Sequence, residues 1–383
     1  MSGLEEVIER SRANGFHLAV LFPDGRRIPE RGEANFTVRA KNAAGLRALA
    51  SLNVLPLSEA YMRGDLEFEG DLVRAVALWF NELGDPQPLI KAWRWLAPRL
   101  LGRARFNPSW IAKHYDSGNI QLLAADGDWR TYTPGIYAGD DDTLEGGAQR
   151  KLAFAFEQLR LAPGAHLLEI GCGWGGMTRY SARRGVKVTG ITLSRDQLDT
   201  TNRLVADEAL DARALYQDFF TFEPAERFDA ISMMGVIEDL SDYPQVMQRV
   251  ARWLKPGGRA YLDFASSIDK VATSSFITKH IWPGAFRMVY MPQFITAVVK
   301  SPLEIAAIWN DRRNYHLWSA KVHDRWVDRR EEAIRMAGEE TWRMMRVLFA
   351  GTAGVMDSPY HDITAFRVLL ELPADTIRAS TPT

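Results

Sequence analysis

The chain has 383 residues, of which 46% are hydrophobic, so it is long enough to bury a sizeable core and to form two or three domains. Its 47 Lys and Arg residues nearly balance its 48 Asp and Glu residues, so the net charge proposes neither a nucleic-acid partner nor a strongly acidic one. A single cysteine excludes an internal disulfide. Because the chain also opens without a basic and then apolar signal segment, we expect a cytoplasmic location.

The first 85 residues alternate short patterned segments with turn signals. The apolar run from Leu18 to Phe22 ends at a Pro-Asp-Gly turn, and residues 34–40 alternate like a half-buried strand. Segments 43–51 and 71–81 have the apolar spacing of helices. Residues 1–85 are therefore predicted to form a small α+β domain.

A basic and aromatic linker follows at 86–110. Its cations alternate with tryptophans and leucines over residues 86–106, and no acid lies among them. This composition is typical of a helix in a membrane interface, but a linker helix that packs its aromatic side chains on a neighbouring domain has it too, and Pro98 interrupts any long helix. No apolar run reaches the ~18 residues that span a bilayer, so any membrane contact would be made from the surface. The cations are Lys91, Arg94, Arg99, Arg103 and Arg105.

From about residue 150 the pattern becomes one of helices alternating with short apolar strands. This order predicts a Rossmann-like, doubly wound α/β sheet in a domain at 111–383, with its ligand at the carboxyl ends of the strands. Helices are expected at 148–159, after residue 176 and at 243–254. Strands are expected at 167–170, 186–192, 214–216, 228–233, 259–264 and 366–372.

Residues 266–350 are rich in aromatic side chains and are expected to form a helical cap inserted in this domain. Such side chains would suit an apolar lining for a long substrate, but a helical core uses them as well. The candidates for substrate contact are Trp282, Phe286, Tyr290 and Phe294.

Residues 168–176 form a buried strand that runs into a glycine turn, with glycines at Gly171, Gly173, Gly175 and Gly176. A glycine turn lets the backbone approach a ligand, as it also does in dinucleotide-binding proteins. Glu169 favours S-adenosylmethionine (SAM) instead, because an acid inside the strand can orient the loop or pair with an ammonium group, whereas it would oppose a diphosphate.

Two further loops support this interpretation. Thr192, Ser194 and Gln197 follow the second strand and offer hydroxyl and amide groups to a ribose, while Gln217 and Asp218 follow the third strand, beside rings that suit an adenine. Three loops in this order predict a SAM site.

The glycine turn also contains Cys172, whose thiol could act as a nucleophile. We interpret it as a small packed residue, because no His lies beside it in the sequence. The sequence suggests no metal site.

With these motifs in place, the chain resembles the cyclopropane fatty acid synthase family over nearly its full length. The resemblance implies the class I SAM-dependent methyltransferase fold and attack by a methyl group on the cis double bond of an acyl chain, usually one carried by a membrane phospholipid. It rests on Leu57 to Gly70, His114 to Asn119, Asp142 to Glu145, Glu169 to Gly176 with Trp174, the Thr192 loop, Ile277 to Gly284 and Tyr315.

In that family a bicarbonate ion is the base that closes the ring, and the segment Tyr-Ser-Cys helps to hold it. Tyr132 and Thr133, which are expected to contact the cofactor, stand at that segment, but Pro134 follows them and has no N–H to offer an anion.

The resemblance also marks the catalytic residues. Glu238 and Tyr315 match the family pattern, whereas Asp239 and Asp263 stand where the family has histidines. Extra carboxylates near Glu238 would repel bicarbonate, so we do not expect the ion to bind. In a purely structural interpretation, Asp263 is a solvated strand end and Asp239 a loop cap.

Two products then remain. Loss of a proton from a neighbouring chain carbon, with Glu238 or Asp263 as base, gives a methyl-branched alkene of the kind that precedes furan fatty acids, and this outcome is the preferred one. A carboxylate that replaces bicarbonate would instead close a cyclopropane. The rival functions are a small-molecule C- or N-methyltransferase and a non-catalytic protein that binds SAM or lipid.

The expected partner is thus an unsaturated phospholipid acyl chain, reached at the inner membrane surface by a peripheral protein. A nucleic-acid partner is not expected, and a homodimer is compatible with the sequence.

Overall fold

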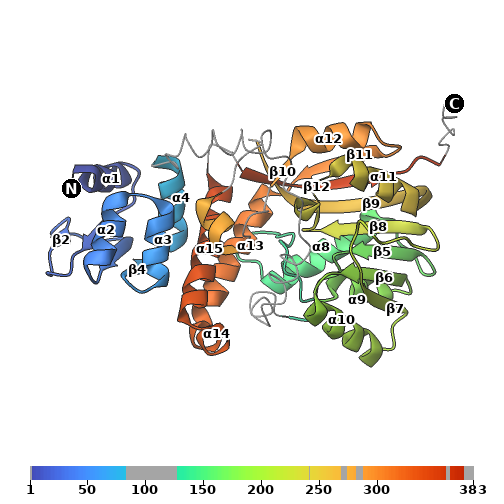
Figure 1. Ribbon diagram of the computed structural model, residues 1–383, viewed down its shortest axis with the longest axis horizontal. Coiled ribbons are helices and arrows are strands. Elements are labelled where there is room, and N and C mark those ends of the chain that lie inside the picture. Colours follow the sequence, from blue (N-terminus) through green and yellow to red (C-terminus); the bar gives the residue numbers. More distant parts are fainter. Residues whose placement is uncertain are drawn as a thin grey trace. The chain divides into compact units, whose positions relative to one another are not determined.

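The computed structural model describes residues 2–82, 127–240, 242–268, 274–281, 288–358 and 363–374. They form two compact units, each assembled from separate stretches of the chain (Figure 1). The first unit comprises the described residues within 1–104, 273–284 and 315–362, and the second those within 105–272, 285–314 and 363–383. The expected linker at 86–110, the motif His114 to Asn119, and the substrate candidates Trp282 and Phe286 lie outside the described residues.

A four-stranded sheet forms the amino-terminal part of the first unit, in the order β2-β1-β3-β4. Strands β1 and β3 are parallel, and the outer strands pair antiparallel with them. The strand predicted at 34–40 is confirmed as β3, and the apolar run at 18–22 contains β1. The bounds are β1 Leu18–Leu21, β2 Arg27–Ile28, β3 Phe36–Ala40 and β4 Leu66–Gly70.

Four helices accompany this sheet, and local capping explains where they start. Helix α2 begins where the Asn42 side chain accepts hydrogen bonds from the N–H groups of Ala44 and Gly45, and it ends at Leu52 in the left-handed conformation. The helices predicted at 43–51 and 71–81 are confirmed as α2 and α4. The bounds are α1 Ser2–Ala13, α2 Ala43–Ser51, α3 Val54–Met62 and α4 Leu72–Glu82.

Helices from the carboxyl-terminal third complete the first unit. The π-helix η2 is short, α13 enters this unit from Tyr315 onward, and α15 packs along α3 and α4. This grouping differs from the expected boundary at residue 85 and from the expectation that residues 266–350 all cap the sheet domain. The bounds are η2 Ile277–Ile281, α13 Arg312–Asp328, α14 Arg330–Ala337 and α15 Glu339–Asp357.

Two arginines, the buried Arg343 and the half-buried Arg346, tie α15 to the motif at 57–70. The guanidinium of Arg343 donates to Glu67 Oε1 at 2.7 Å and to the carbonyl of Tyr61 at 3.0 Å. Arg346 donates to the Tyr61 hydroxyl at 2.7 Å. This family-like motif thus provides a docking surface for a helix of the carboxyl-terminal third.

The second unit is built on a sheet whose main path has the order β11-β12-β9-β8-β5-β6-β7, with β10 paired to β9. Strand β12 runs antiparallel to both of its neighbours, and the other pairs are parallel. All six strands predicted for this domain are present, whereas β11 lies in the range assigned to the cap. The bounds are β5 His166–Ile170, β6 Lys187–Thr192, β7 Ala212–Tyr216, β8 Phe228–Met234, β9 Leu254–Ser267, β10 Val289–Tyr290, β11 Glu304–Asn310 and β12 Ile363–Glu371.

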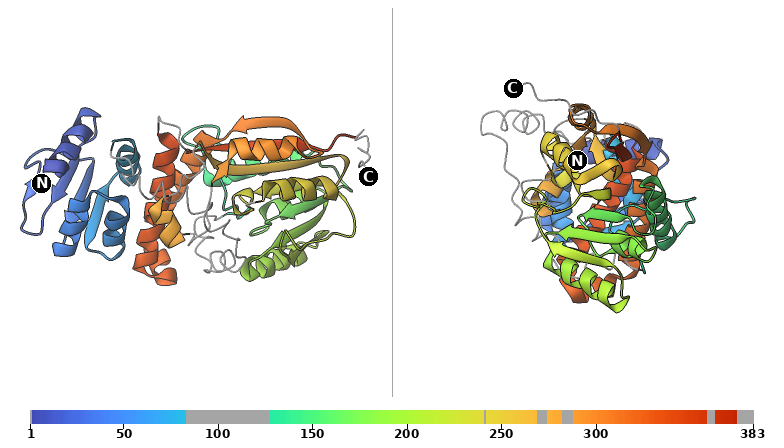
Figure 2. Two further views of the ribbon diagram at one scale, coloured as in Figure 1. Left: turned by 45° about the horizontal axis from the view of Figure 1, so that its top comes forward. Right: turned by 90° about the vertical axis from the view of Figure 1, so that its right-hand side faces the viewer.

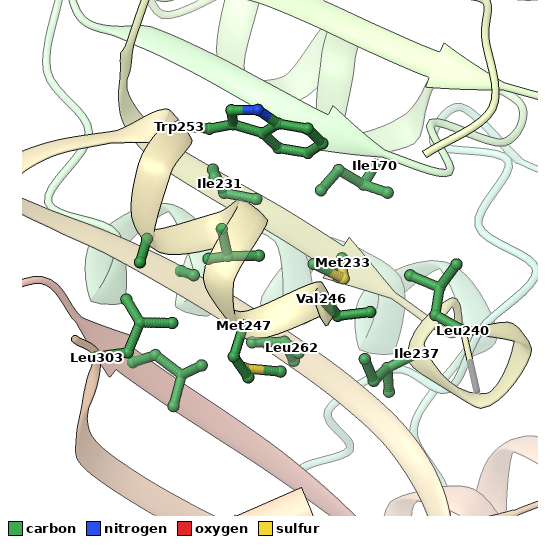
Figure 3. Packing of buried hydrophobic residues seen from close by; sticks show 14 of the residues in the cluster. Ile170, Ile231, Met233, Ile237, Leu240, Val246, Met247, Trp253, Leu262 and Leu303 are labelled. Carbon is green, nitrogen blue, oxygen red and sulfur yellow. The ribbon is translucent and has the colours of Figure 1, made fainter. Parts of the chain in front are cut away.

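Side chains of the central strands alternate between two apolar layers, one on each face of this sheet. Leu168 and Ile170 of β5 belong to the layer that includes α11 and α12, whereas Leu167 belongs to the layer formed with α8 and α9 (Figures 1 and 2). Figure 3 shows the first layer, in which Met247 and Trp253 of α11 cover strand residues. The bounds are α8 Leu144–Gln158, α9 Gly176–Ala182, α10 Arg195–Asp207, η1 Ile237–Asp239, α11 Tyr243–Trp253 and α12 Met291–Val299.

Within the described ranges, no helix combines the length and the apolar character needed to cross a membrane.

Candidate functional site

A cavity opens at the carboxyl ends of β5, β6, β7 and β8, where β5 lies between β6 and β8 and the strand order reverses. It is lined by the loops that follow these four strands and by residues 130–133. Eleven of the twelve expected cofactor residues line it, and Gly175 lies just behind as the residue before α9. The eleven are Tyr132, Thr133, Glu169, Gly171, Gly173, Trp174, Thr192, Ser194, Gln197, Gln217 and Asp218.

The surroundings of this turn leave room only for glycine at two of its positions. Gly171 has a φ of 70°, and a Cβ added there would lie 2.4 Å from Cγ2 of Val236. A Cβ on Gly176 would lie 2.5 Å from the carbonyl oxygen of Trp129. The turn therefore lies between the loop after β8 and the segment at 129–133, and it leaves its backbone to line the cavity.

Glu169 is buried at the end of β5 and lines the cavity. Its Oε2 accepts a hydrogen bond from the hydroxyl of Thr178 at 2.5 Å, which ties the strand to α9 across the turn. Burial raises the pKa of this carboxyl to about 8, despite the hydrogen bond. A cationic group brought beside it would favour the ionised form, so this acid fits the ammonium of SAM and does not fit a diphosphate.

The loops after β6 and β7 are held by hydrogen bonds among their own polar groups. The hydroxyl of Thr192 donates to Oε1 of Gln197 at 2.9 Å, and Ser194 caps α10 by accepting from the Gln197 N–H at 3.3 Å. Asp218 accepts from the N–H of Phe220 at 2.7 Å. Some groups expected to bind a ribose or an adenine therefore fix the loop shapes instead, and the rest of each side chain faces the cavity.

The segment at 128–133 forms one wall of the cavity and is held at both ends by cations. Arg179 of α9 donates to the carbonyl of Asp128, and Lys151 of α8 donates to the hydroxyl of Thr133. Burial raises the pKa of the Tyr132 phenol, which therefore stays neutral.

Two carboxyl groups lie on η1, directly after β8. Glu238 Oε1 accepts from the N–H of Ala265 at 2.9 Å, and its buried Oε2 has no hydrogen-bond partner among the described residues. Burial, reinforced by the charges of Asp239 and Asp263, raises the pKa of Glu238 to about 8. Asp239 lines the cavity, and burial raises its pKa to about 7. The two acids that the sequence placed together are thus together, and both favour the neutral form.

Asp263 lies on β9, and its surroundings differ from both interpretations made from the sequence. It is 2% exposed, so it is not a solvated strand end. Its Oδ2 lies 2.8 Å from Nζ of Lys151, which is itself 1% exposed. The negative charge expected to repel bicarbonate is therefore compensated by an adjacent cation.

Lys151, which holds the cavity wall through Thr133, is one of the residues that the sequence prediction missed. It lies on the buried face of α8 with Ala148, Leu152 and Ala155. A lysine three and four residues from apolar positions on a core-facing helix is a signal that could have identified it, because lysine is rarely buried without a partner.

The remaining candidates are distributed through both units. Tyr315 is buried on α13 and belongs to the first unit, and Tyr290 is half-buried in β10. Phe294 is fully buried against Phe264, with ring centroids 5.2 Å apart. It therefore packs in the core, whereas the sequence analysis expected it to contact the substrate. Cys172 is buried and its pKa is raised well above the ordinary value by burial, as expected for a packed thiol.

Comparison with known proteins shows the family to which the chain belongs. Residues 104–366 match the family model described as mycolic acid cyclopropane synthetase. A probable fatty acid methyltransferase of Mycobacterium tuberculosis is 32% identical over 367 residues, covering 85% of this chain and 86% of its own. The cyclopropane-fatty-acyl-phospholipid synthase of Escherichia coli is 31% identical over 269 residues, covering 67% and 68%.

The fold has a solved counterpart. A mycolic acid cyclopropane synthase complexed with SAH and CTAB superposes with a TM-score of 0.63 at 22% identity, covering 70% of this chain and 99% of its own. This likeness shows the fold.

Proposed function

Because the chain belongs to the mycolic acid cyclopropane synthetase family and is a SAM-dependent methyltransferase acting on fatty acyl chains, we propose that it methylates the double bond of an unsaturated chain carried by a phospholipid. We propose further that the product is a methyl-branched unsaturated chain and that bicarbonate takes no part.

When bound, SAM supplies the methyl group as an electrophile. An isolated alkene is a weak nucleophile, so the protein contributes a fixed position for the chain and a site without water. Methyl addition leaves a carbocation on the chain, and the reaction ends only when a base removes a proton. The position of that base selects the product.

The observation that carries the proposal is the state of Glu238. One carboxylate oxygen is held by the Ala265 N–H, and the other is buried without a partner among the described residues. Glu238 itself is not among the residues that line the cavity, whereas its neighbours Asp239 and Leu240 are. A pKa of about 8 is suitable for a base that works near neutral pH. Asp263 also has a buried oxygen without a partner among the described residues, but its other oxygen already pairs with Lys151 at 2.8 Å.

Fewer groups oppose bicarbonate than the sequence suggested. Lys151 compensates Asp263, and Glu238 and Asp239 repel an anion only in their ionised forms, which burial disfavours. Pro134 adds a second reason, because it lacks the N–H that an anion would accept from that position. We propose that the ionised Glu238 carboxylate is the base and that it removes the proton from a neighbouring chain carbon, so that no ring closes.

Labelled SAM tests the product. The full chain is incubated with vesicles of a cis-monounsaturated phospholipid and SAM carrying a CD3 methyl group, and the released acyl chains are analysed by mass spectrometry. A methyl-branched alkene keeps all three deuterium atoms, because the proton leaves a chain carbon, and it takes up hydrogen on mild hydrogenation. A cyclopropane keeps two deuterium atoms and resists mild hydrogenation.

Three results would contradict the proposal in different ways. Retention of two deuterium atoms in a chain that resists hydrogenation would establish ring closure. Stimulation of the rate by added bicarbonate would contradict the role given to Glu238. Formation of S-adenosylhomocysteine only with an added small-molecule acceptor, and not with lipid, would exclude the acyl substrate.

We also propose that the protein works as a peripheral protein on the cytoplasmic side of the membrane, because a phospholipid chain is reached there. Co-sedimentation with anionic phospholipid vesicles at two salt concentrations checks this, since electrostatic attachment weakens as salt rises. A homodimer stays a prediction, and analytical ultracentrifugation checks it.

A further inference from the structure

We propose that Lys151 is a positioning residue that ties the cofactor wall at 132–133 to the strand end beside the catalytic carboxyl, so that cofactor affinity depends on it. This inference rests on the proposed function only for the role of Glu238. Lys151 acts through its contacts with Thr133 and Asp263.

The geometry places one ammonium group between two elements far apart in the chain. Nζ of Lys151 donates to the Thr133 hydroxyl on the cavity wall, and it lies 2.8 Å from Oδ2 of Asp263 on β9. Lys151 and Asp263 are 1% and 2% exposed. An ammonium has three donors and a fixed reach, so these two partners set the distance between the wall and the strand.

Both contacts lead directly into the site. Thr133 lines the cavity, and a Cβ on Gly235 would lie 2.7 Å from its Cγ2, so the threonine is packed against the loop after β8. The carbonyl of Asp263 accepts from the Gly235 N–H at 3.0 Å, and two residues further along β9 the Ala265 N–H holds Glu238. A shift of Lys151 would therefore move the cofactor wall and the support of Glu238 together.

The burial of this charge indicates more than a passive packing role. A buried ion pair brings a large desolvation cost, and apolar side chains of similar volume at the same positions are often at least as stable. The second buried pair nearby, Arg367 and Asp311 at 2.5 Å, is directed to Asn314 and does not contact the cavity wall. Lys151 is the cation that joins the wall to the strand.

The experiment separates positioning from folding with three variants and one readout, the Kd for S-adenosylhomocysteine measured by isothermal titration calorimetry on the full chain. Thr133→Val keeps the shape of the wall and the ion pair but removes the hydrogen bond to Lys151. We expect its Kd to rise about 3- to 30-fold with thermal stability close to wild type. Its KM for SAM should rise while kcat changes less.

Lys151→Met is expected to lower stability strongly, because it leaves Asp263 buried without its cation. The double variant Lys151→Met with Asp263→Leu removes both charges and should recover much of that stability. Its Kd for S-adenosylhomocysteine should nevertheless stay raised about 3- to 30-fold, because the tie to Thr133 is still missing.

Lys255→Met is the matched control. Lys255 pairs with Asp229 at 2.9 Å, but both side chains are partly exposed and neither lines the cavity. Its Kd should equal that of the wild type. Wild-type Kd values for both Thr133→Val and the double variant would overturn the proposal. Since no lipid is used, this failure is distinct from a failure to methylate acyl chains, which the labelled-SAM experiment reports.

Discussion

At the scale of single residues, three carboxyl groups in or beside the cavity are held in environments that favour their neutral forms. Glu169 and Glu238 have pKa values of about 8, and Asp239 has one of about 7, each because of burial. Only one of these groups, Glu238, combines burial with an oxygen that lacks a partner in the described part of the chain. This difference distinguishes a proton acceptor from a group that orients a loop.

The pH dependence of kcat/KM should report Glu238. A base acts only when ionised, so kcat/KM is expected to rise with pH and to level off near the pKa of about 8. Glu238→Gln should lower kcat by roughly 10²- to 10⁴-fold, because the amide cannot accept the proton. Initial rates with vesicle substrate between pH 6 and 9 measure both effects. Unchanged S-adenosylhomocysteine affinity in this variant shows that the fold is kept, and a rate close to wild type would exclude Glu238 as the base.

Glu169 should make the free energy of unfolding depend on pH. Well below the ordinary pKa of 4.5, the Glu169 carboxyl is protonated in both the folded and the unfolded chain. Above 4.5 the carboxyl ionises in the unfolded chain, whereas in the folded chain it stays protonated up to about 8. Its contribution to stability is therefore lost as pH rises from about 4.5 to 8. Denaturant titrations should show Glu169→Gln gaining on the wild type by on the order of 1 kcal/mol per pH unit in this window. A constant difference between the two proteins would contradict the raised pKa.

The sequence identified Gly171 and Glu169 but not Lys151, because the partners of Lys151 lie far from it in the chain. Gly171 and Glu169 are identified by a motif of a few consecutive residues. Lys151 contacts Thr133 and Asp263, which stand on separate elements, so its role depends on how those elements pack. Sequence alone places a lysine there on a core-facing helix, and it does not supply the partner.

At the scale of elements, the contact of α15 with α4 depends on a small residue. A Cβ added to Gly354 would lie 2.7 Å from the backbone nitrogen of Ala77, whereas one added to Gly351 on the same helix would meet nothing within 4 Å. Gly354→Ala should therefore lower the free energy of unfolding by about 1–3 kcal/mol. Gly351→Ala should be neutral or raise it by up to about 1 kcal/mol, because alanine favours the helix.

Thermal denaturation of the two variants in parallel tests this pair. Equal melting temperatures would show that the helices adjust to the added methyl group.

Strand β11 shows why some elements escaped prediction. Residues 304–310 alternate between exposed and half-buried positions, as expected for a strand at the edge of a sheet. Their sequence lies among aromatic helical segments, and the dominant composition of that range suggested one continuous cap. The central strands were predicted because burial on both faces gives continuous apolar runs.

At the scale of the whole molecule, neither unit is a continuous stretch of chain. Residues 1–104 supply the amino-terminal sheet and helices, but α15, which packs on α3 and α4, comes from the carboxyl-terminal third. A fragment of residues 1–104 should therefore expose the apolar surface that α15 covers and should lack a cooperative thermal transition. Circular dichroism and binding of a hydrophobic dye check this, and a sharp two-state melt without dye binding would show that the fragment is an independent domain.

The arginines of α15 have a consequence for the protein as it is made. Tyr61 and Glu67 leave the ribosome long before Arg343 and Arg346, their partners in the finished unit. At about 5–20 residues per second, translation leaves the nascent amino-terminal stretch waiting on the order of ten seconds to a minute for α15. During that interval chaperones can bind the apolar surface that α15 later covers. Slower translation would lengthen the period in which the nascent chain can aggregate.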